Sequence, residues 1–514
     1  MLGYIAILWL LLLFPAAASA QDHASAVAHH EQGMALYRGH NPEGAIRELT
    51  RAVEFDTRYA EAWNDLGVIE RQQGHLNTAL DCFRKAVAEQ PRFVGALYNL
   101  ALALEASGDV EAAIGQVRSV IALAPRMPQA HALYGRLLMR QNHLEAARDQ
   151  LRQAIGLDPG LASAHTNLGA VLYKLGQVSE ALRELQRAVE QQPQSAQAHF
   201  QLGLALFSSG AQQEAKAAFE KAVDLDPDLA EARINLGQLY ESENRMPEAI
   251  AQYRRAAEAS FGSADAELRL ARALIRMQSF DEARRTLDAA LHRHPRDAAL
   301  HFERGKLLAS VGDREAALLD LKAAVQFDPK AAESYLELSR LLHDLGRTDE
   351  QRAALEAAVR IDPNLVEARY ALANLARQQG DAEQAREQLA KVRRLKQAEI
   401  DRDLALGEIR AGVVLAGRHE YDAAIEHFRK ALSIDPNLGE AHFDLAGALL
   451  EKGDAAAAIS SFRHALQIAP QWAEAHYQLG RALLQAGRHE EAMEEFRAAV
   501  KYDPEHVAAR DALK

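Results

Sequence analysis

The sequence predicts an all-α solenoid, a stack of about 14 helix pairs in which each pair packs mainly on its neighbours. The 514-residue chain repeats with a period of 34 residues, and each period carries two apolar helical patterns separated by a turn. Counted from Ala26, the eighth position of every repeat holds a small residue. These residues are Gly33, Gly67, Ala101, Gly135, Gly169, Gly203, Gly237, Ala271, Gly305, Ser339, Ala373, Gly412, Ala446 and Gly480.

The repeats fall into two blocks. Eleven repeats occupy residues 26–399 without a gap, and three more occupy residues 405–506. Residues 400–404 form a junction between the blocks, and residues 507–514 are expected to form a partial capping helix. Residues 381–406 contain neither proline nor glycine, which predicts one lengthened helix or a helix with an irregular joint. The junction is therefore either a hinge between the blocks or a rigid, longer helix.

The two helices of each repeat are expected to pack closely. In the last repeat, Gly480 at position 8 faces Ala492 at position 20, while Phe496 at position 24 fills the adjacent space. Position 20 is alanine in 13 repeats, and Gln351 is the exception. Proline at position 32, as at Pro91, ends the second helix in eleven repeats because it lacks an amide hydrogen.

These residues resemble the signature of the tetratricopeptide repeat family, from Ala26 to His506. The run Trp63 to Gly67 (WNDLG) is among the clearest fragments. The resemblance implies antiparallel helix pairs stacked into a right-handed superhelix, with the first helices lining a concave groove and the second helices facing outward.

The first 20 residues have the pattern of a secretory signal peptide. An unbroken apolar run ends in the small residues Ala18, Ser19 and Ala20, which predicts cleavage before Gln21. Residues 21–25 are then a short leader. The alternative is an uncleaved anchor, because the apolar stretch nearly suffices to span a bilayer. Both alternatives place the repeats outside the cytoplasm, in the periplasm or secreted, and only the anchor would insert in a membrane.

Charge and cysteine content limit the kinds of partner and chemistry that we expect of this protein. A net charge of −13 argues against nucleic acid or an anionic lipid surface as the main partner. Cys82 is the only cysteine, so no internal disulfide forms, and its position in a second helix predicts an inert thiol rather than a reactive one.

No pattern of catalytic or metal-binding residues was found. Histidine recurs at position 4, as at His131 and His165, but side chains one repeat apart are separated by about 8–10 Å, too far to share a metal ion. These histidines are expected to replace an aromatic residue in packing. His489 and Glu490 lack the second histidine of a zinc-protease helix. We therefore expect neither an enzyme nor a cofactor.

The family resemblance places candidate ligand contacts at the groove positions of the first helices, chiefly positions 5, 6 and 9. Apolar side chains with polar neighbours suit an extended peptide. For each residue the alternative is ordinary packing between helices. The candidates are Tyr98, Asn99, Arg136, Asn167, Phe200, Asn235, Arg272, Phe302, Lys306, Arg340, Tyr370, Phe443 and Tyr477.

The expected function is that of a non-enzymatic scaffold that binds protein or peptide segments in this groove, in the periplasm or cell envelope. The alternative is a structural component of an envelope machine, of the pilus or polysaccharide-export type, that acts through self-association or spacing. No repeat has Lys or Arg at position 5, so the terminal-carboxylate clamp of chaperone-binding relatives is not expected.

Overall fold

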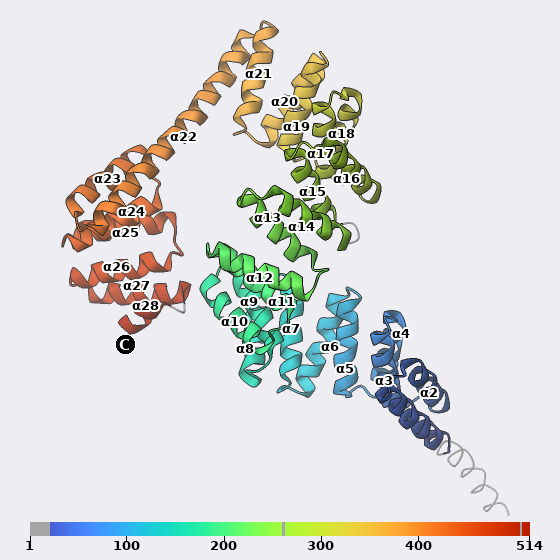
Figure 1. The fold of residues 1–514 in the computed structure, drawn as a ribbon. Helices are drawn as coiled ribbons and strands as arrows, with labels where there is room; N and C mark the ends of the chain where they lie inside the picture. The colour runs from blue at the N-terminus through green and yellow to red at the C-terminus, as the bar shows by residue number, and fades with distance from the viewer. Residues whose placement is uncertain (1–20, 260–262, 504–505) are drawn as a thin grey trace, which may run out of the picture. The chain divides into compact units, whose positions relative to one another are not determined.

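The computed structural model describes residues 21–259, 263–503 and 506–514. Every regular element in these ranges is a helix (Figure 1). Within each of the two compact units of the chain, consecutive helices pack against each other. The expected all-α array of helix pairs is thereby confirmed. The predicted signal peptide, residues 1–20, lies outside the described residues. The chain divides into two units, Met1–Pro295 and Arg296–Lys514.

The first unit contains eight helix pairs. Residues 21–38 form one helix, so the expected leader at residues 21–25 extends the first helix of repeat 1. The other helices are α2 (Pro42–Phe55), α3 (Ala60–Gln72), α4 (Leu76–Glu89), α5 (Val94–Ala106), α6 (Val110–Leu123), α7 (Pro128–Arg140), α8 (Leu144–Leu157), α9 (Ala162–Lys174), α10 (Val178–Gln191), α11 (Ala196–Ser208), α12 (Gln212–Leu225), α13 (Ala230–Ser242), α14 (Met246–Ala259), α15 (Ala264–Arg276) and α16 (Phe280–Arg293).

The second unit contains repeats 9 to 14. Its helices are α17 (Ala298–Ser310), α18 (Arg314–Phe327), α19 (Ala332–Asp344), α20 (Thr348–Ile361), α21 (Val366–Gln378), α22 (Ala382–Gly417), α23 (Tyr421–Ile434), α24 (Gly439–Glu451), α25 (Ala455–Ile468), α26 (Ala473–Gln485), α27 (His489–Tyr502) and α28 (Val507–Ala512). The 36 residues of α22 serve both as the second helix of repeat 11 and as the first helix of repeat 12 (Figure 1). Residues 400–404 therefore lie inside a continuous helix.

Turn residues and prolines bound the helices as the sequence pattern predicts. The chain leaves α9 through Gly176, whose φ of +77° is strained for residues with a side chain. The helix α10 then runs to Gln191 and ends two residues before Pro193. Proline cannot donate the next helical hydrogen bond, so the second helix ends at a similar place in repeats that carry this proline.

The small residue at position 8 permits close contact between the two helices of a repeat. A Cβ atom placed on Gly480 would lie 2.5 Å from Cε1 of Phe496, which is itself fully buried. Ala492 at position 20 is also fully buried. The predicted packing of positions 8, 20 and 24 is therefore confirmed in this repeat.

A polar contact that we call the position-4 clasp adds to this packing. The Nδ1 atom of His165 lies 2.6 Å from a carboxylate oxygen of Glu184 in the second helix of the same repeat. The Nε2 atom lies 3.1 Å from the carbonyl oxygen of Pro159 in the preceding turn. His131 makes the equivalent pair of contacts, and Arg233 does so with its guanidinium. The recurring histidines thus pack between helices, as expected, and also form hydrogen bonds.

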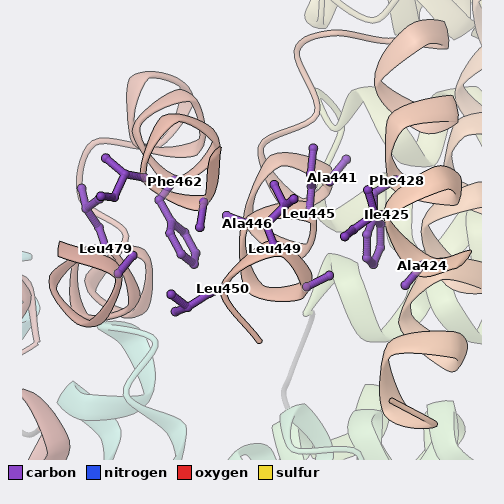
Figure 2. Packing of buried hydrophobic residues seen from close by; sticks show 14 of the residues in the cluster. Ala424, Ile425, Phe428, Ala441, Leu445, Ala446, Leu449, Leu450, Phe462 and Leu479 are labelled. Atoms are coloured by element: carbon purple, nitrogen blue, oxygen red, sulfur yellow. The ribbon is translucent and has the colours of Figure 1, made fainter. Parts of the chain in front are cut away.

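Repeats 12 to 14 share one apolar core. Phe428 of α23, Leu445 and Leu449 of α24, Phe462 of α25 and Leu479 of α26 belong to a single buried cluster (Figure 2). Each helix contributes side chains to the next, so these repeats form a rigid support for the surface formed by their first helices.

Candidate binding site on the first helices

Several pairs of successive first helices touch each other within a unit. Contacts join α7 to α9 and α9 to α11, and in the second unit they join α22 to α24 and α24 to α26. In the described parts of the chain, no two successive second helices make comparable contacts. The first helices therefore lie closer together, and their exposed side chains share one face, which we call the first-helix face.

A cavity of about 320 Å³ opens on this face where α22, α24 and α26 meet. Most of its wall comes from positions 5, 6, 9, 12 and 13 of the three first helices. Its lining residues are Val413, Ala416, Tyr421, Phe428, Phe443, Asp444, Gly447, Ala448, Leu450, Glu451, Phe462, Gln478 and Arg481.

The apolar wall of the cavity is held in place by aromatic contacts. The ring of Phe443 stacks on Trp472 with ring centroids 4.5 Å apart, and it meets the edge of Phe462 at 5.6 Å. Gly447 leaves the centre of the site open, because a Cβ atom there would have no neighbour within 4 Å. The cavity is thus a preformed space beside a fixed aromatic ring.

The polar wall contains one carboxylate without a partner. Asp444 forms no hydrogen bond or ion pair with any residue that the structure describes. Burial, with a smaller contribution from nearby Glu440, raises the pKa of Asp444 to about 6. Arg481, by contrast, is already engaged, since it donates to Gln478 at 2.8 Å and lies 3.6 Å from Glu451.

A second cavity, of about 420 Å³, opens on the first helices of repeats 10 and 11. Most of its lining residues are polar, and they include Arg340, His343 and Asn374. Gln351 also lines it, at the one position 20 that is not alanine, and its side chain is buried. The one repeat that lacks alanine at position 20 thus has a cavity beside that position.

The first three predicted groove residues of the first unit already have neighbours. Tyr98 packs, half-buried, against the core of repeats 2 to 4, and burial raises the pKa of its hydroxyl. Asn99 donates to the side-chain oxygen of Asn64 at 2.9 Å. Arg136 pairs with the carboxylate of Glu105 through two hydrogen bonds, at 2.8 and 2.6 Å. These side chains contribute to contacts between repeats.

The other predicted residues of this unit are more varied. Phe200 is only 8% exposed and packs on Phe219, with ring centroids 6.1 Å apart. Asn235 donates to a backbone carbonyl one turn earlier in its helix. Asn167 is half-buried and Arg272 is exposed. Phe200 therefore offers a ligand little surface without rearrangement.

In the second unit, Tyr370 is the most exposed predicted aromatic residue, at 54%. Phe302 is half-buried beneath the ammonium group of Lys306, which lies 5.0 Å from the ring centroid. Tyr477 packs against Phe496 and His506. Arg340 pairs with a carboxylate one turn away and lines the second cavity.

Of the predicted residues, Phe443 alone lines the cavity at α22, α24 and α26, and the role of the others in binding stays a prediction. Sequence reasoning missed Asp444, Gly447 and Val413 at this site. One signal was present, since repeat 13 combines an acid at position 6 with a glycine at position 9, where five other repeats have Arg or Lys.

The middle of α22 exposes a second apolar surface. Val414, at position 10 of repeat 12, is 54% exposed, whereas Ala448 and Ala482 at the same position of the next repeats are 3% and 0% exposed. In those repeats a separate second helix, α23 or α25, packs against the first helix, but α22 continues without a turn and has no such helix before it. Ile400 and Leu404 lie exposed on the same side of α22. We call these three residues the open face of α22.

Other functional signals are weak in the described residues. Cys82 is buried, and burial raises the pKa of its thiol to about 11, in keeping with the expected inert thiol. Across the described ranges no group of His, Cys, Asp or Glu is arranged to hold a metal ion. No helix among them combines the length and apolar character required to cross a membrane.

Sequence models of one repeat family match almost the whole array. Two models described as tetratricopeptide repeat match most of it, and further models described as TPR repeat and tetratricopeptide repeat match the remaining segments. The matched residues are 30–92, 69–128, 166–230, 213–264 and 302–366 for one model, 242–310, 415–460 and 449–514 for another, and 135–176 and 366–391 for two more. No curated protein matches the chain.

Solved structures with similar folds include a tetratricopeptide repeat protein from Parabacteroides merdae, at 17% identity, covering 48% of this chain and 98% of that chain with a TM-score of 0.42. A second is the Cut9–Hcn1 hetero-tetramer of the APC/C, at 16% identity, 88% and 96% coverage and a TM-score of 0.35. A third is YrrB, described as a TPR protein with an unusual peptide-binding site, at 21% identity, 36% and 95% coverage and a TM-score of 0.30.

Proposed function

The chain belongs to the tetratricopeptide repeat family, and from this premise we propose that it is a non-enzymatic scaffold whose first-helix face holds an extended segment of a partner protein. The observation that carries the proposal is the cavity between α22, α24 and α26, where a fixed aromatic wall meets a carboxylate that has no partner among the described residues. Such a combination of apolar surface and a few polar groups is typical of sites that orient a ligand.

An extended peptide suits this site better than a folded surface does. The cavity is narrow enough to accept one or two side chains, and the polar side chains of Gln478 and Glu451 lie in its wall. The rigid core below the site means that little conformational entropy is lost when a segment binds.

We further propose that the scaffold works outside the cytoplasm, in the periplasm or secreted. This rests on the apolar sequence of residues 1–20 and its small-residue end. Mass spectrometry of the protein from its native cells tests the proposal. A mature chain that begins at Gln21 supports cleavage and export, an intact chain in the membrane fraction supports the anchor, and an intact chain in the cytoplasm contradicts export.

Filling the cavity tests the binding site. A leucine at Gly447 would project into open space, so Gly447→Leu should block the cavity without disturbing the core. Gly115→Leu is the matched control, because Gly115 also lies in a helix with no neighbour near its Cβ position. Peptides enriched from a random heptapeptide phage library on the unmodified protein should bind the control equally and Gly447→Leu at least tenfold more weakly. Equal binding to all three proteins would remove this cavity from the proposal.

The open face of α22 favours a second candidate function, assembly by self-association. Ile400, Leu404 and Val414 expose apolar surface, whereas Ala448 and Ala482, at the position of Val414 in the next two repeats, are buried. A second copy of the chain could cover this surface. Sedimentation velocity should show an oligomer at micromolar concentration, and Val414→Glu should dissociate it. A monomer over the whole concentration range would exclude this function.

A further inference from the structure

We infer that the cavity between α22, α24 and α26 recognises a lysine or arginine side chain of the bound segment, with Asp444 as its anionic partner. The inference rests on the proposed function and adds the chemical class of the ligand. Its starting point is that Asp444 faces a preformed space and lacks a partner among the described residues of the chain.

The equivalent residue of another repeat shows that this lack of a partner is not general. Asp65 occupies position 6 of repeat 2, as Asp444 does in repeat 13. Asp65 lies 2.9 Å from the imidazole Nε2 of His30 and accepts a hydrogen bond from Asn64 at 3.0 Å. The fold thus satisfies the acid in repeat 2 with one donor from the neighbouring repeat and one from the same helix, whereas no described residue donates to Asp444.

The charges around the cavity favour a cation. Glu440 lies one turn before Asp444 on α24, and Glu451 lies at the end of the same helix beside the cavity. The only basic side chain in the lining, Arg481, is already engaged by Glu451 and Gln478. An incoming ammonium or guanidinium group would therefore meet an uncompensated negative charge in a partly desolvated place, where ion pairs are stronger than at an open surface.

The apolar walls fit the remainder of a long basic side chain. Phe443, Val413 and Leu450 line the same cavity as Asp444, and Gly447 leaves its centre free. Lysine and arginine bury their methylene stems along apolar surface while the charged end meets a polar group. A short polar side chain would leave the aromatic wall uncovered, and an aliphatic side chain would leave Asp444 without a partner.

The titration of Asp444 supports this geometry. Burial raises its pKa to about 6, and a bound cation would favour the ionised form. Other titratable or charged groups that face the site are Glu440 and Glu451 on α24, Tyr421 on α23 and Arg481 on α26. Residues of α22 in the lining carry no charge. Binding of a basic segment should therefore weaken as the pH falls through about 6.

Selection of peptides by three variants tests the inference. A random heptapeptide phage library is panned on the unmodified protein, on Asp444→Asn and on Asp444→Lys, with Asp65→Asn as the matched control. The unmodified protein and Asp65→Asn should enrich sequences with Lys or Arg at one fixed place. Asp444→Asn should lose this preference, and Asp444→Lys should select Asp or Glu instead. Circular dichroism and the melting temperature establish that each variant is folded.

Measured affinities of single peptides show how much the basic side chain contributes to binding. Replacement of the enriched lysine by norleucine should weaken binding to the unmodified protein about tenfold, and should have little effect on binding to Asp444→Asn. Peptides that bind in the cavity, as judged by their loss on Gly447→Leu, but show no basic preference would overturn the inference while leaving the proposed function intact. Selection of no cavity-dependent peptide would overturn both.

Discussion

His165 and Glu184 are joined by a 2.6 Å contact between the imidazole Nδ1 and a carboxylate oxygen, and this contact ties the first helix of repeat 5 to the second. The other ring nitrogen reaches the carbonyl oxygen of Pro159, so a single side chain connects three segments. His165 is only 2% exposed. The clasp therefore contributes at a place where an unpaired polar atom would be costly.

Removing the carboxylate from this clasp should destabilise the array. Glu184→Ala leaves a buried imidazole nitrogen without its partner, at a cost of about 1–3 kcal/mol. Glu190→Ala is the control, because Glu190 is exposed on the same helix. Hydrogen exchange of the α9 and α10 amides measures the effect locally, which is preferable in a long array that need not unfold in two states. Equal protection in both variants would argue against a stabilising role for the clasp.

The glycines at positions 8 and 9 of two neighbouring first helices should respond in opposite ways to alanine. Gly480→Ala brings a Cβ atom to 2.5 Å from the buried Phe496 ring, so we expect a loss of about 1–3 kcal/mol. Gly447→Ala enters open space and should stabilise its helix by about 0.5–1 kcal/mol. Thermal unfolding of both variants and the parent gives the comparison. Changes of the same sign would contradict the packing argument.

His476 should make stability depend on pH near neutrality. Burial lowers its pKa, but the hydrogen bonds to Glu495 and to the carbonyl oxygen of Pro470 outweigh burial, and the pKa is raised. Folding therefore favours protonated His476. Its contribution to the free energy of unfolding is complete below the unfolded pKa of about 6.5, and it is lost as the pH rises through the higher pKa of the folded state.

The unmodified protein should therefore exceed His476→Gln in free energy of unfolding by the largest amount at about pH 5.5, and this difference should shrink towards about pH 8. Urea denaturation at each pH measures this difference. His489→Gln, at the start of α27, controls for the general effect of removing an imidazole. An advantage that grows with pH would show that the sign is wrong.

Asp444 should affect stability in another way, because its ionisation lowers the stability of the folded chain as the pH rises. Its pKa is raised from 3.8 to about 6 in the folded chain, chiefly by burial, so the unfolded chain releases this proton first. Folded stability then falls as the pH rises between these two values and is constant above them. Without a ligand, Asp444→Asn should be more stable than the parent above pH 6, and this difference should decrease on acidification. A difference independent of pH would indicate that Asp444 is well solvated.

The fold was largely predictable because its determinants are local. Gly480, Ala492 and Phe496 predicted the contact between two helices only 16 residues apart, and Pro193 marks the end of α10 through its own covalent structure. The stretch around residues 400–404 was less certain. The absence of proline and glycine permitted a continuous helix, but whether that helix bends depends on what packs around it.

The candidate site was predictable only in part. Position in the repeat selected Phe443, which lines a cavity, and by the same reasoning Phe200, which is buried against Phe219. The same residue type at the same position can line a cavity or fill one. The outcome depends on the size of side chains in the adjoining repeats, which are distant in sequence.

The sequence by itself determined the helix pairs, their small-residue contacts and their proline boundaries, because these follow from periodicity and backbone chemistry within about 34 residues. Only the tertiary structure decided that Asp65 has partners while Asp444 has none among the described residues, and that Val414 is exposed while Ala448 is buried. These differences arise between repeats. Whether a side chain finds a hydrogen-bond partner or is buried depends on residues of the adjoining repeats, which the sequence of its own repeat does not specify.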